Sequence, residues 1–222
     1  MSEFTTGVLY PRKYEPKVIL TLPKAKQPYF HKRVNNDWNA FFLQDECIER
    51  AETLQFLLGL SAHYVPLLWF HDSEESGWGF RLFDGGLETT SATISYSLDM
   101  QLAECQFMSR HPEVEQIEDF WENEHLRQEY ESILDQVVRS DPFKREVWKG
   151  ISRFRPQCFG RFLSHKQVQQ LGSLFDIQLL TEVEEETGGS ILYDSVDLFK
   201  EIIGIEEMVW VNFAYLAGGR QE

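Results

Sequence analysis

The segment Trp69–Gly86, WFHDSEESGWGFRLFDGG, carries the signals that decide the predicted fold. Two runs of aromatic and aliphatic residues flank a short polar stretch, and the second run ends at Asp84-Gly85-Gly86. Asp-Gly is typical of a tight hairpin turn, because a type I′ turn requires positive φ at both central residues. Together with residues 87–97, which are rich in β-branched side chains, the segment predicts a three-stranded antiparallel meander.

The chain before this segment predicts further strands. Residues 4–22 alternate in part between apolar and polar side chains, which indicates one or two strands. Pro11 and Pro16 interrupt this stretch, and we expect an edge position because proline cannot donate to a neighbouring strand. Residues 23–36 are polar and contain prolines, so they predict a loop.

Residues 45–60 give the clearest helix signal in the chain. Asp45 is a suitable N-cap, and Gly59 is placed to end the helix in a left-handed conformation. The apolar side chains between them recur at helical spacing and form one stripe. That stripe consists of Ile48, Ala51, Leu54, Leu57 and Leu58.

Residues 98–175 have a mainly helical pattern. Helices are predicted over 98–110, 140–151 and 164–175, and residues 113–139 predict two helices or one kinked helix. The C-terminal part mixes signals, since short apolar runs do not separate strand from helix. It predicts a strand over 176–183, a turn at 184–190, a helix over 194–205 ended by Gly204, and a last strand over 208–216.

These elements predict an α+β fold. We expect an antiparallel β-meander from the N-terminal half, packed by a central helical region, with a C-terminal strand returning to the sheet. The length of 222 residues fits a single domain over residues 1–222, with a weak possible boundary near residues 100–112.

The charge of the chain restricts its partners. The formal net charge is −15, which repels phosphate backbones and favours a basic protein partner. Residues 1–33 are the exception, because seven basic and two acidic residues give them a net charge of +5 and leave −20 for the remainder. We expect this segment to lie across the acidic body; the alternative is a basic arm for an anionic partner.

Cysteine usage and hydropathy indicate a compartment. Cys47, Cys105 and Cys158 are odd in number and far apart, so they predict reduced thiols and no disulfide framework. The N-terminus shows no signal-peptide pattern, and no run approaches the ~18 apolar residues of a membrane-spanning helix. These features predict a soluble cytoplasmic protein, of a character common among bacterial cytosolic proteins.

The polar stretch after Trp69 has two interpretations. His71, Asp72 and Glu74 or Glu75 have the ligand chemistry of zinc, manganese or iron, which supports a metal-dependent hydrolase. No second histidine follows within two to five residues, however, and Asp, Ser and Glu are common in turns. We favour a solvent-facing turn, with no metal and no cofactor.

Two other sequence patterns are candidates for a reactive or metal-binding site, but their signals are less specific. Cys158 lies near Arg153, Arg155 and Arg161 in the sequence, and cations close to a thiol lower its pKa. We expect these arginines to pair instead with carboxylates of this acidic protein, and Cys158 to be an unreactive thiol. Glu122 and His125 have the E-x-x-H spacing of di-iron helical bundles. That site requires two copies and the chain has one, so an exposed helix face is favoured.

The sequence therefore predicts non-enzymatic binding of a basic protein, with an immunity-like or inhibitor-like role, and no nucleic-acid or membrane partner. Tryptophan anchors interfaces, and acidic side chains steer basic partners. The alternatives are the metal-dependent hydrolase and a small-molecule sensor with an aromatic pocket. The predicted contact residues are Trp69, His71, Asp72, Glu74, Glu75, Trp78 and Trp210.

Overall fold

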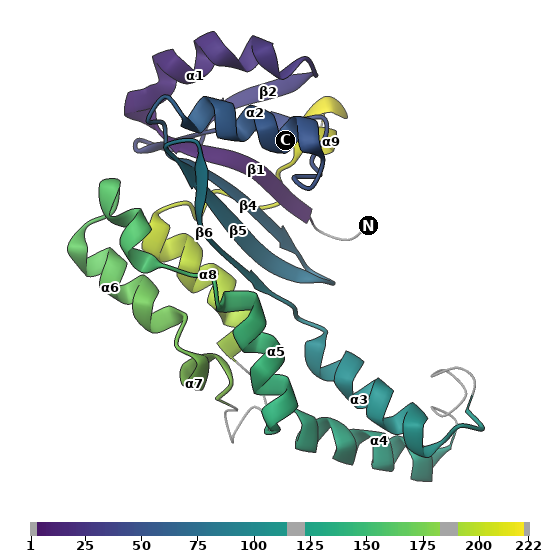
Figure 1. Cartoon of the computed structure of the whole chain (residues 1–222). Helices are drawn as coiled ribbons and strands as arrows, with labels where there is room; N and C mark the ends of the chain where they lie inside the picture. Colours follow the sequence, from purple (N-terminus) through teal and green to yellow (C-terminus); the bar gives the residue numbers. More distant parts are fainter. Residues whose placement is uncertain (1–3, 115–122, 183–190, 220–222) are drawn as a thin grey trace.

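The computed structural model describes residues 4–114, 123–182 and 191–219, and its fold is α+β, as predicted (Figure 1). Within these ranges the strands form one six-stranded antiparallel sheet in the order β2-β3-β1-β4-β5-β6. The strands are β1 (Phe4–Pro11), β2 (Tyr29–Arg33), β3 (Trp38–Leu43), β4 (Leu67–Ser73), β5 (Gly77–Asp84) and β6 (Leu87–Ile94).

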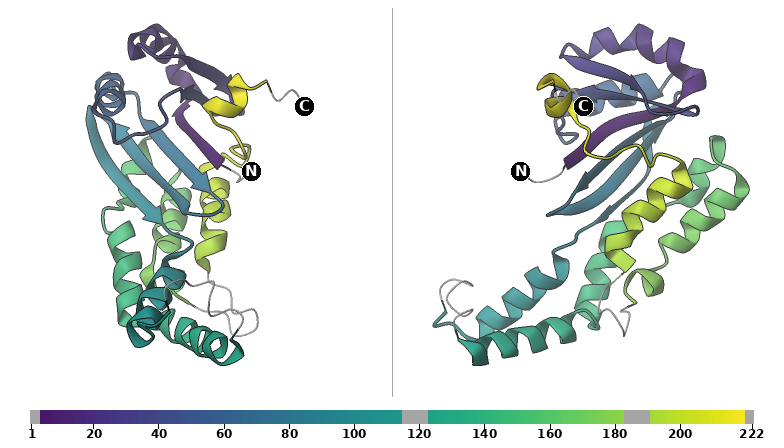
Figure 2. Two further views of the ribbon diagram at one scale, coloured as in Figure 1. Left: turned by 90° about the vertical axis from the view of Figure 1, so that its right-hand side faces the viewer. Right: turned by 180° about the vertical axis from the view of Figure 1, so that it is seen from behind.

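Helices cover the two faces of the sheet unequally (Figures 1 and 2). The helices α1 and α2 cover one face of the sheet, where α2 also contacts β5 and β6, while α5, α6 and α8 lie against the opposite face of β4, β5 and β6. An antiparallel pair, α3 and α4, extends away from the sheet as an arm. The helices are α1 (Glu15–Thr21), α2 (Ala51–Ser61), α3 (Leu98–Arg110), α4 (Glu124–Val137), α5 (Asp141–Ile151), α6 (His165–Leu174), α7 (Ile177–Leu180), α8 (Ile191–Ile203) and α9 (Phe213–Ala217).

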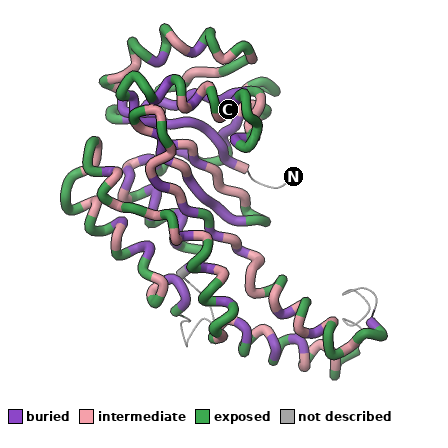
Figure 3. The backbone as a smooth tube through the Cα atoms, viewed as in Figure 1, coloured by how far each residue is buried: buried purple, intermediate pink, exposed green. Residues whose placement is uncertain are grey.

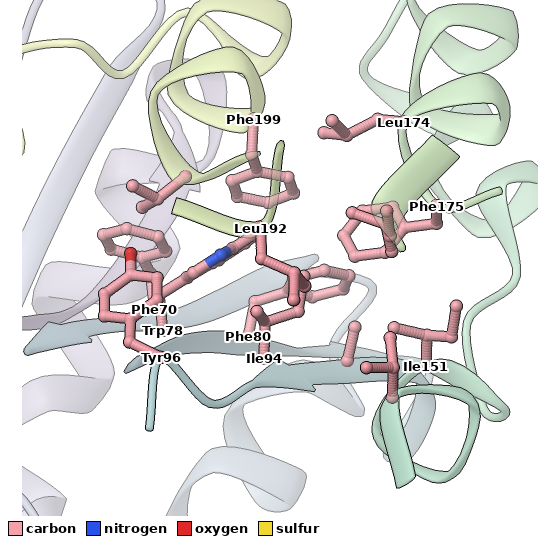
Figure 4. Close-up of a cluster of buried hydrophobic side chains, with 14 of the residues drawn as sticks. Phe70, Trp78, Phe80, Ile94, Tyr96, Ile151, Leu174, Phe175, Leu192 and Phe199 are labelled. Atoms are coloured by element: carbon pink, nitrogen blue, oxygen red, sulfur yellow. The ribbon is translucent and has the colours of Figure 1, made fainter. Parts of the chain in front are cut away.

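The sheet separates two hydrophobic cores, because successive side chains of a strand point to opposite faces. The smaller core lies under α1 and α2 and includes Tyr10, Leu57 and Phe83. The larger core joins the sheet to the helices and is rich in aromatic rings (Figure 4). The larger core extends into the arm, where it includes buried residues of α3 and α4. Buried residues are concentrated along the strands (Figure 3).

The meander predicted from residues 69–97 is confirmed. The strands β4, β5 and β6 pair in sequence order, and the turn between β5 and β6 has φ of +61° at Gly85 and +83° at Gly86. The central pair of the turn is therefore Gly85-Gly86 and not Asp84-Gly85, because Asp84 is the last residue of β5 and pairs with Leu87.

The N-terminal half differs from the prediction. The strand β1 lies in the centre of the sheet, between β3 and β4, and not at an edge. Pro11 is the last residue of β1, and Pro16 lies in the first turn of α1, where no N–H donor is needed. Residues 23–36 contain β2, and β3 was not predicted.

The helix predicted over residues 45–60 begins and ends later than expected. It is α2, from Ala51 to Ser61, and Asp45 lies before it, accepting a hydrogen bond from the Thr53 hydroxyl. Gly59 is inside the helix, so the prediction that it ends the helix is wrong.

The C-terminal part also needs correction. The strand predicted from residue 176 is helical at Ile177–Leu180, because the Asp176 side chain caps that turn, and residues 184–190 lie outside the described residues. The last strand, predicted over residues 208–216, does not form. This segment contacts β1, where the Thr6 N–H donates a hydrogen bond to the Val211 carbonyl at 3.0 Å. Its last residues belong to the helix α9, Phe213–Ala217.

The helices predicted between residues 98 and 175 are present as α3, α5 and α6. Of the suggested boundary near residues 100–112, residues 100–110 lie within α3. Of the predicted segment 113–139, residues 115–122 lie outside the described residues and Glu124–Val137 is α4. Gly204 ends α8 as predicted, with φ of +77°, although α8 begins before Asp194.

Two glycine substitutions test these helix ends. Gly59→Ala should raise the free energy of unfolding by about 0.5–1 kcal/mol, because glycine weakens a helix interior and an added methyl meets no atom within 4 Å. Gly204→Ala should lower it by about 1 kcal/mol, because its φ is left-handed. Urea unfolding measures both, and a loss of stability for Gly59→Ala would contradict the observed course of α2.

Candidate functional site

The strand β4 continues through Ser73, so His71 and Asp72 belong to a strand and not to the predicted turn. Only Glu74, Glu75 and Ser76 form the turn before β5. Adjacent strand residues point to opposite faces of a sheet. His71 therefore lies on the side of Trp69, and Asp72 lies on the side of α8. The two residues cannot bind one metal ion together.

Asp72 forms an ion pair with a lysine of α8. The Lys200 ammonium lies 2.7 Å from Asp72 Oδ2, and the Lys200 side chain is only 8% exposed. The same ammonium lies 5.7 Å from the centre of the Phe70 ring. The Tyr96 hydroxyl makes a long hydrogen bond of 3.5 Å to the other Asp72 oxygen. A largely buried charge requires such a partner, because burial removes its hydration.

This ion pair lies in a pocket of about 380 Å³ where the end of β4 meets α8 and the C-terminal segment. We call it the acidic–aromatic pocket. Its lining residues are Thr5, Asp72, Glu74, Tyr96, Tyr193, Val196, Asp197, Lys200, Val209 and Trp210.

Three aromatic side chains shape the pocket. The rings of Tyr96 and Tyr193 stack with 5.3 Å between centroids, and the Tyr193 hydroxyl donates to the Tyr96 carbonyl. Trp210 is 54% exposed and has φ of +49°, in the left-handed region. A bulky residue there is a true outlier, and such strain gathers at functional sites.

Negative charge dominates the pocket. Asp72, Glu74 and Asp197 contribute three carboxylates, while Lys200 is the single cationic residue of the lining. Burial and the neighbouring Asp72 carboxylate raise the pKa of Tyr96, so its hydroxyl remains a hydrogen-bond donor. The pocket therefore offers aromatic faces and carboxylate oxygens to a ligand.

The His71 side of β4 has a different character. The imidazole packs on Trp69 with 4.7 Å between ring centroids, and its Nδ1 is buried without a hydrogen-bond partner among the described residues. Burial lowers the pKa of His71 to about 4, so the ring is neutral near pH 7. The part of the chain that the structure describes contains no group of three His, Cys, Asp or Glu side chains placed to hold a metal.

The remaining predicted contact residues are dispersed. Trp78 is completely buried, with its indole N–H donating to Ser195 Oγ at 2.9 Å, so its assignment as a partner contact is corrected. Trp69 is half-buried on the His71 side, and Glu75 is exposed in the turn. The pocket thus brings together only Asp72, Glu74 and Trp210 of the predicted set.

Two of the three arginines near Cys158 pair with carboxylates, as expected, whereas Arg155 donates to the Ser152 and Phe154 carbonyls. Arg153 pairs with Glu88 and Arg161 pairs with Asp84, while the Cys158 thiol donates to the Thr89 carbonyl. Glu122, of the E-x-x-H pattern, lies outside the described residues.

Sequence reasoning missed Lys200, Tyr96, Tyr193 and Asp197. One signal was present in the sequence, because Lys200 lies four residues after Val196 and three before Ile203, on the apolar stripe of its helix. A lysine on such a stripe needs a buried counter-ion.

Comparisons with known proteins give no relative. No protein-family model matches the chain, and neither the curated proteins nor the solved structures contain a match. Among the helices of the described ranges, none has both the length and the apolar composition needed to cross a membrane.

A double-mutant cycle tests the ion pair of the pocket. Asp72→Asn should lower the free energy of unfolding by about 2–4 kcal/mol, because it leaves the Lys200 charge buried without its partner. Adding Lys200→Met should recover at least about 1 kcal/mol of that loss. Urea unfolding provides the values, Glu74→Gln is the matched control, and strictly additive losses would exclude a coupled pair.

The neutral state of His71 gives a testable pH dependence. Its pKa in the folded protein lies below the ordinary 6.5, so stability is lost as the pH falls from about 6.5 toward 4. Between pH 7 and pH 4, His71→Gln should lose about 1–3 kcal/mol less stability than the wild type. Urea unfolding at both pH values measures this, with exposed His63→Gln as the control; equal losses for His71→Gln and wild type would contradict it.

Proposed function

We propose that this protein is a non-enzymatic, cytoplasmic protein-binding module whose acidic–aromatic pocket accepts a lysine or arginine side chain of a basic partner. The observation that carries the proposal is the excess of carboxylates over ammonium groups in an aromatic-lined pocket. Cations are attracted both to carboxylate oxygens and to the faces of aromatic rings.

The hydrogen bonding of the pocket leaves acceptors for a ligand. Asp72 Oδ2 is occupied by Lys200, but among the described residues Asp72 Oδ1 has only the long contact with Tyr96. Asp197 lies 3.7 Å from Lys200, at the outer limit of an ion pair, and its side chain is 82% exposed. Glu74 is exposed beside them. A guanidinium group, with five donors in one plane, suits this set of acceptors.

The exposed Trp210 supports a binding role over a structural one. Its left-handed backbone costs roughly 1–3 kcal/mol, yet more than half of the side chain is in solvent. An aromatic ring held rigidly at the rim of a pocket can pack against the methylene groups and the charge of a long cationic side chain. Tryptophan is also enriched among residues that dominate binding energy.

The charge of the whole chain supports the same type of partner. A net charge of −15 accelerates encounter with a basic protein at low ionic strength. An immunity-like or inhibitor-like role, in which an acidic protein covers a basic nuclease or toxin, fits these electrostatics.

A pair of peptides tests the proposal directly. A fluorescein-labelled nona-arginine peptide should bind, and the neutral nona-citrulline peptide should not, because the pocket selects for charge. Trp210→Ala should weaken binding of nona-arginine about tenfold, as measured by fluorescence anisotropy. Trp148→Ala is the matched control, because Trp148 on α5 is equally exposed at 54%.

A second pair of variants separates the pocket from general charge attraction. Glu74→Gln/Asp197→Asn should weaken nona-arginine binding, whereas Glu124→Gln/Asp135→Asn, at exposed positions of α4, should change it less than twofold. Equal losses for the two pairs would contradict a role for the pocket.

A further inference from the structure

A second surface of the molecule is basic, and its cations have no counter-ion among the residues that the structure describes. Residues 12–33 form two short 3₁₀ helices, α1 and β2 at one end of the molecule (Figures 1 and 2). We call this region the basic end. Its seven cations, Arg12, Lys13, Lys17, Lys24, Lys26, Lys32 and Arg33, form no ion pair with a carboxylate of the described residues.

The N-terminal segment lies across the body, as expected, because β1 is a central strand and Val18 packs into the smaller core, but its basic side chains do not pair with the acidic side chains of the described residues. Every ion pair among the described residues uses a basic side chain from Arg50 or later in the chain. Six of the seven cations are exposed and Arg12 is half-buried; Arg12, Lys17 and Arg33 donate to carbonyl or amide oxygens, although the chain holds 36 acidic residues. Internal charge pairing therefore does not account for the composition of the basic end.

An apolar pocket opens within the basic end. It has a volume of about 440 Å³ between α1 and the end of α2. Leu20 and Tyr64 line it and are 78% and 68% exposed, respectively. At its rim, the Lys17 ammonium donates to the His63 carbonyl at 3.4 Å.

The backbone of Tyr64 gives an independent sign of function. Its φ of +60° is left-handed, so a tyrosine is held in a strained conformation with its ring mainly in solvent. Neither the smaller nor the larger hydrophobic core includes Tyr64. The Tyr64 N–H donates to the Ser61 carbonyl at 3.0 Å and closes the turn after α2, which leaves the ring free to contact a partner.

We propose that the basic end binds a short acidic segment of a partner protein, which inserts one apolar side chain between Leu20 and Tyr64. The carboxylates of the segment pair with Lys13, Lys17 and Lys24. These lysines are exposed and lie four and seven residues apart along one helical stretch, so they can follow a single bound peptide. This surface is distinct from the acidic–aromatic pocket, and the inference does not depend on the proposed function.

Charge favours a peptide over a nucleic acid as the ligand. Residues 34–222 carry a net charge of −20, so a long polyphosphate that extends beyond the basic end meets repulsion. A short acidic peptide contacts the basic end alone. An apolar side chain of the peptide also removes exposed Leu20 and Tyr64 from water, at about 25 cal/mol per Å² of apolar surface.

A labelled peptide tests the charge requirement. The probe is fluorescein-Asp-Glu-Leu-Glu-Asp-Phe-Glu-Asp, and anisotropy measures its Kd for the full chain. Lys17→Glu/Lys24→Glu should raise the Kd at least tenfold. The matched control is Lys144→Glu/Arg145→Glu on α5, which makes the same charge change at exposed cations that form no ion pair with a described residue, and it should alter the Kd less than twofold.

A second peptide tests the apolar pocket. Replacing Leu and Phe of the probe by Ser should raise the Kd at least fivefold for the wild type. For Leu20→Ser/Tyr64→Ser the two peptides should bind equally; both altered side chains are exposed, so the fold is retained.

Three results would overturn the proposal. The first is no measurable binding of the Leu/Phe peptide, and the second is equal weakening by the α5 control. The third is tighter binding of a 12-nucleotide oligothymidine or of vesicles containing phosphatidylserine, lost in Lys17→Glu/Lys24→Glu, which would assign the surface to phosphate groups.

Discussion

The contact between Trp78 and α8 determines how the sheet and the helical layer are joined. The indole N–H donates to Ser195 Oγ at 2.9 Å, and the ring lies 5.0 Å from that of Phe199. Phe199 also stacks on Phe80 at 4.9 Å, so α8 is fixed in rotation as well as position (Figure 4). With Ser195 and Phe199 facing the core, the next residue of the helix, Lys200, is directed to the end of β4. The acidic–aromatic pocket follows from that orientation.

The sequence specifies the meander locally, which is why it could be predicted. Its turn chemistry, its β-branched residues and its alternation all lie within 30 residues of each other. The position of β1 is set instead by partners at residues 38–43 and 67–73, and no local pattern identifies them. Because proline avoids central strands, Pro11 led to the wrong prediction of an edge strand. Pro11 is the last residue of β1, opposite Trp38, so it does not interrupt the hydrogen bonding between β1 and β3.

The candidate site depends even more on contacts between residues that are distant in the sequence, which local patterns do not reveal. Asp72 was identified as chemically interesting, but its ion-pair partner lies 128 residues later in the chain. Alternation along β5 shows that Trp78 and Gly79 face different sides, yet it does not show which side other elements cover. Both sides of β5 are covered in much of its length, so Trp78 is buried, whereas Trp210 of the C-terminal segment is 54% exposed.

The sheet also explains why the acidic and basic surfaces do not neutralise each other. Tyr64 precedes β4 and Asp72 lies near its far end, so the seven residues of β4 hold the two surfaces apart by roughly 20 Å, at about 3.3 Å per residue. That separation exceeds the ~8 Å Debye length at physiological ionic strength, which screens their attraction. Each surface therefore retains its charge, and each presents a strained, exposed aromatic side chain beside it. The rigid strand between them keeps the two proposed binding surfaces separate, so the two proposals can be tested independently.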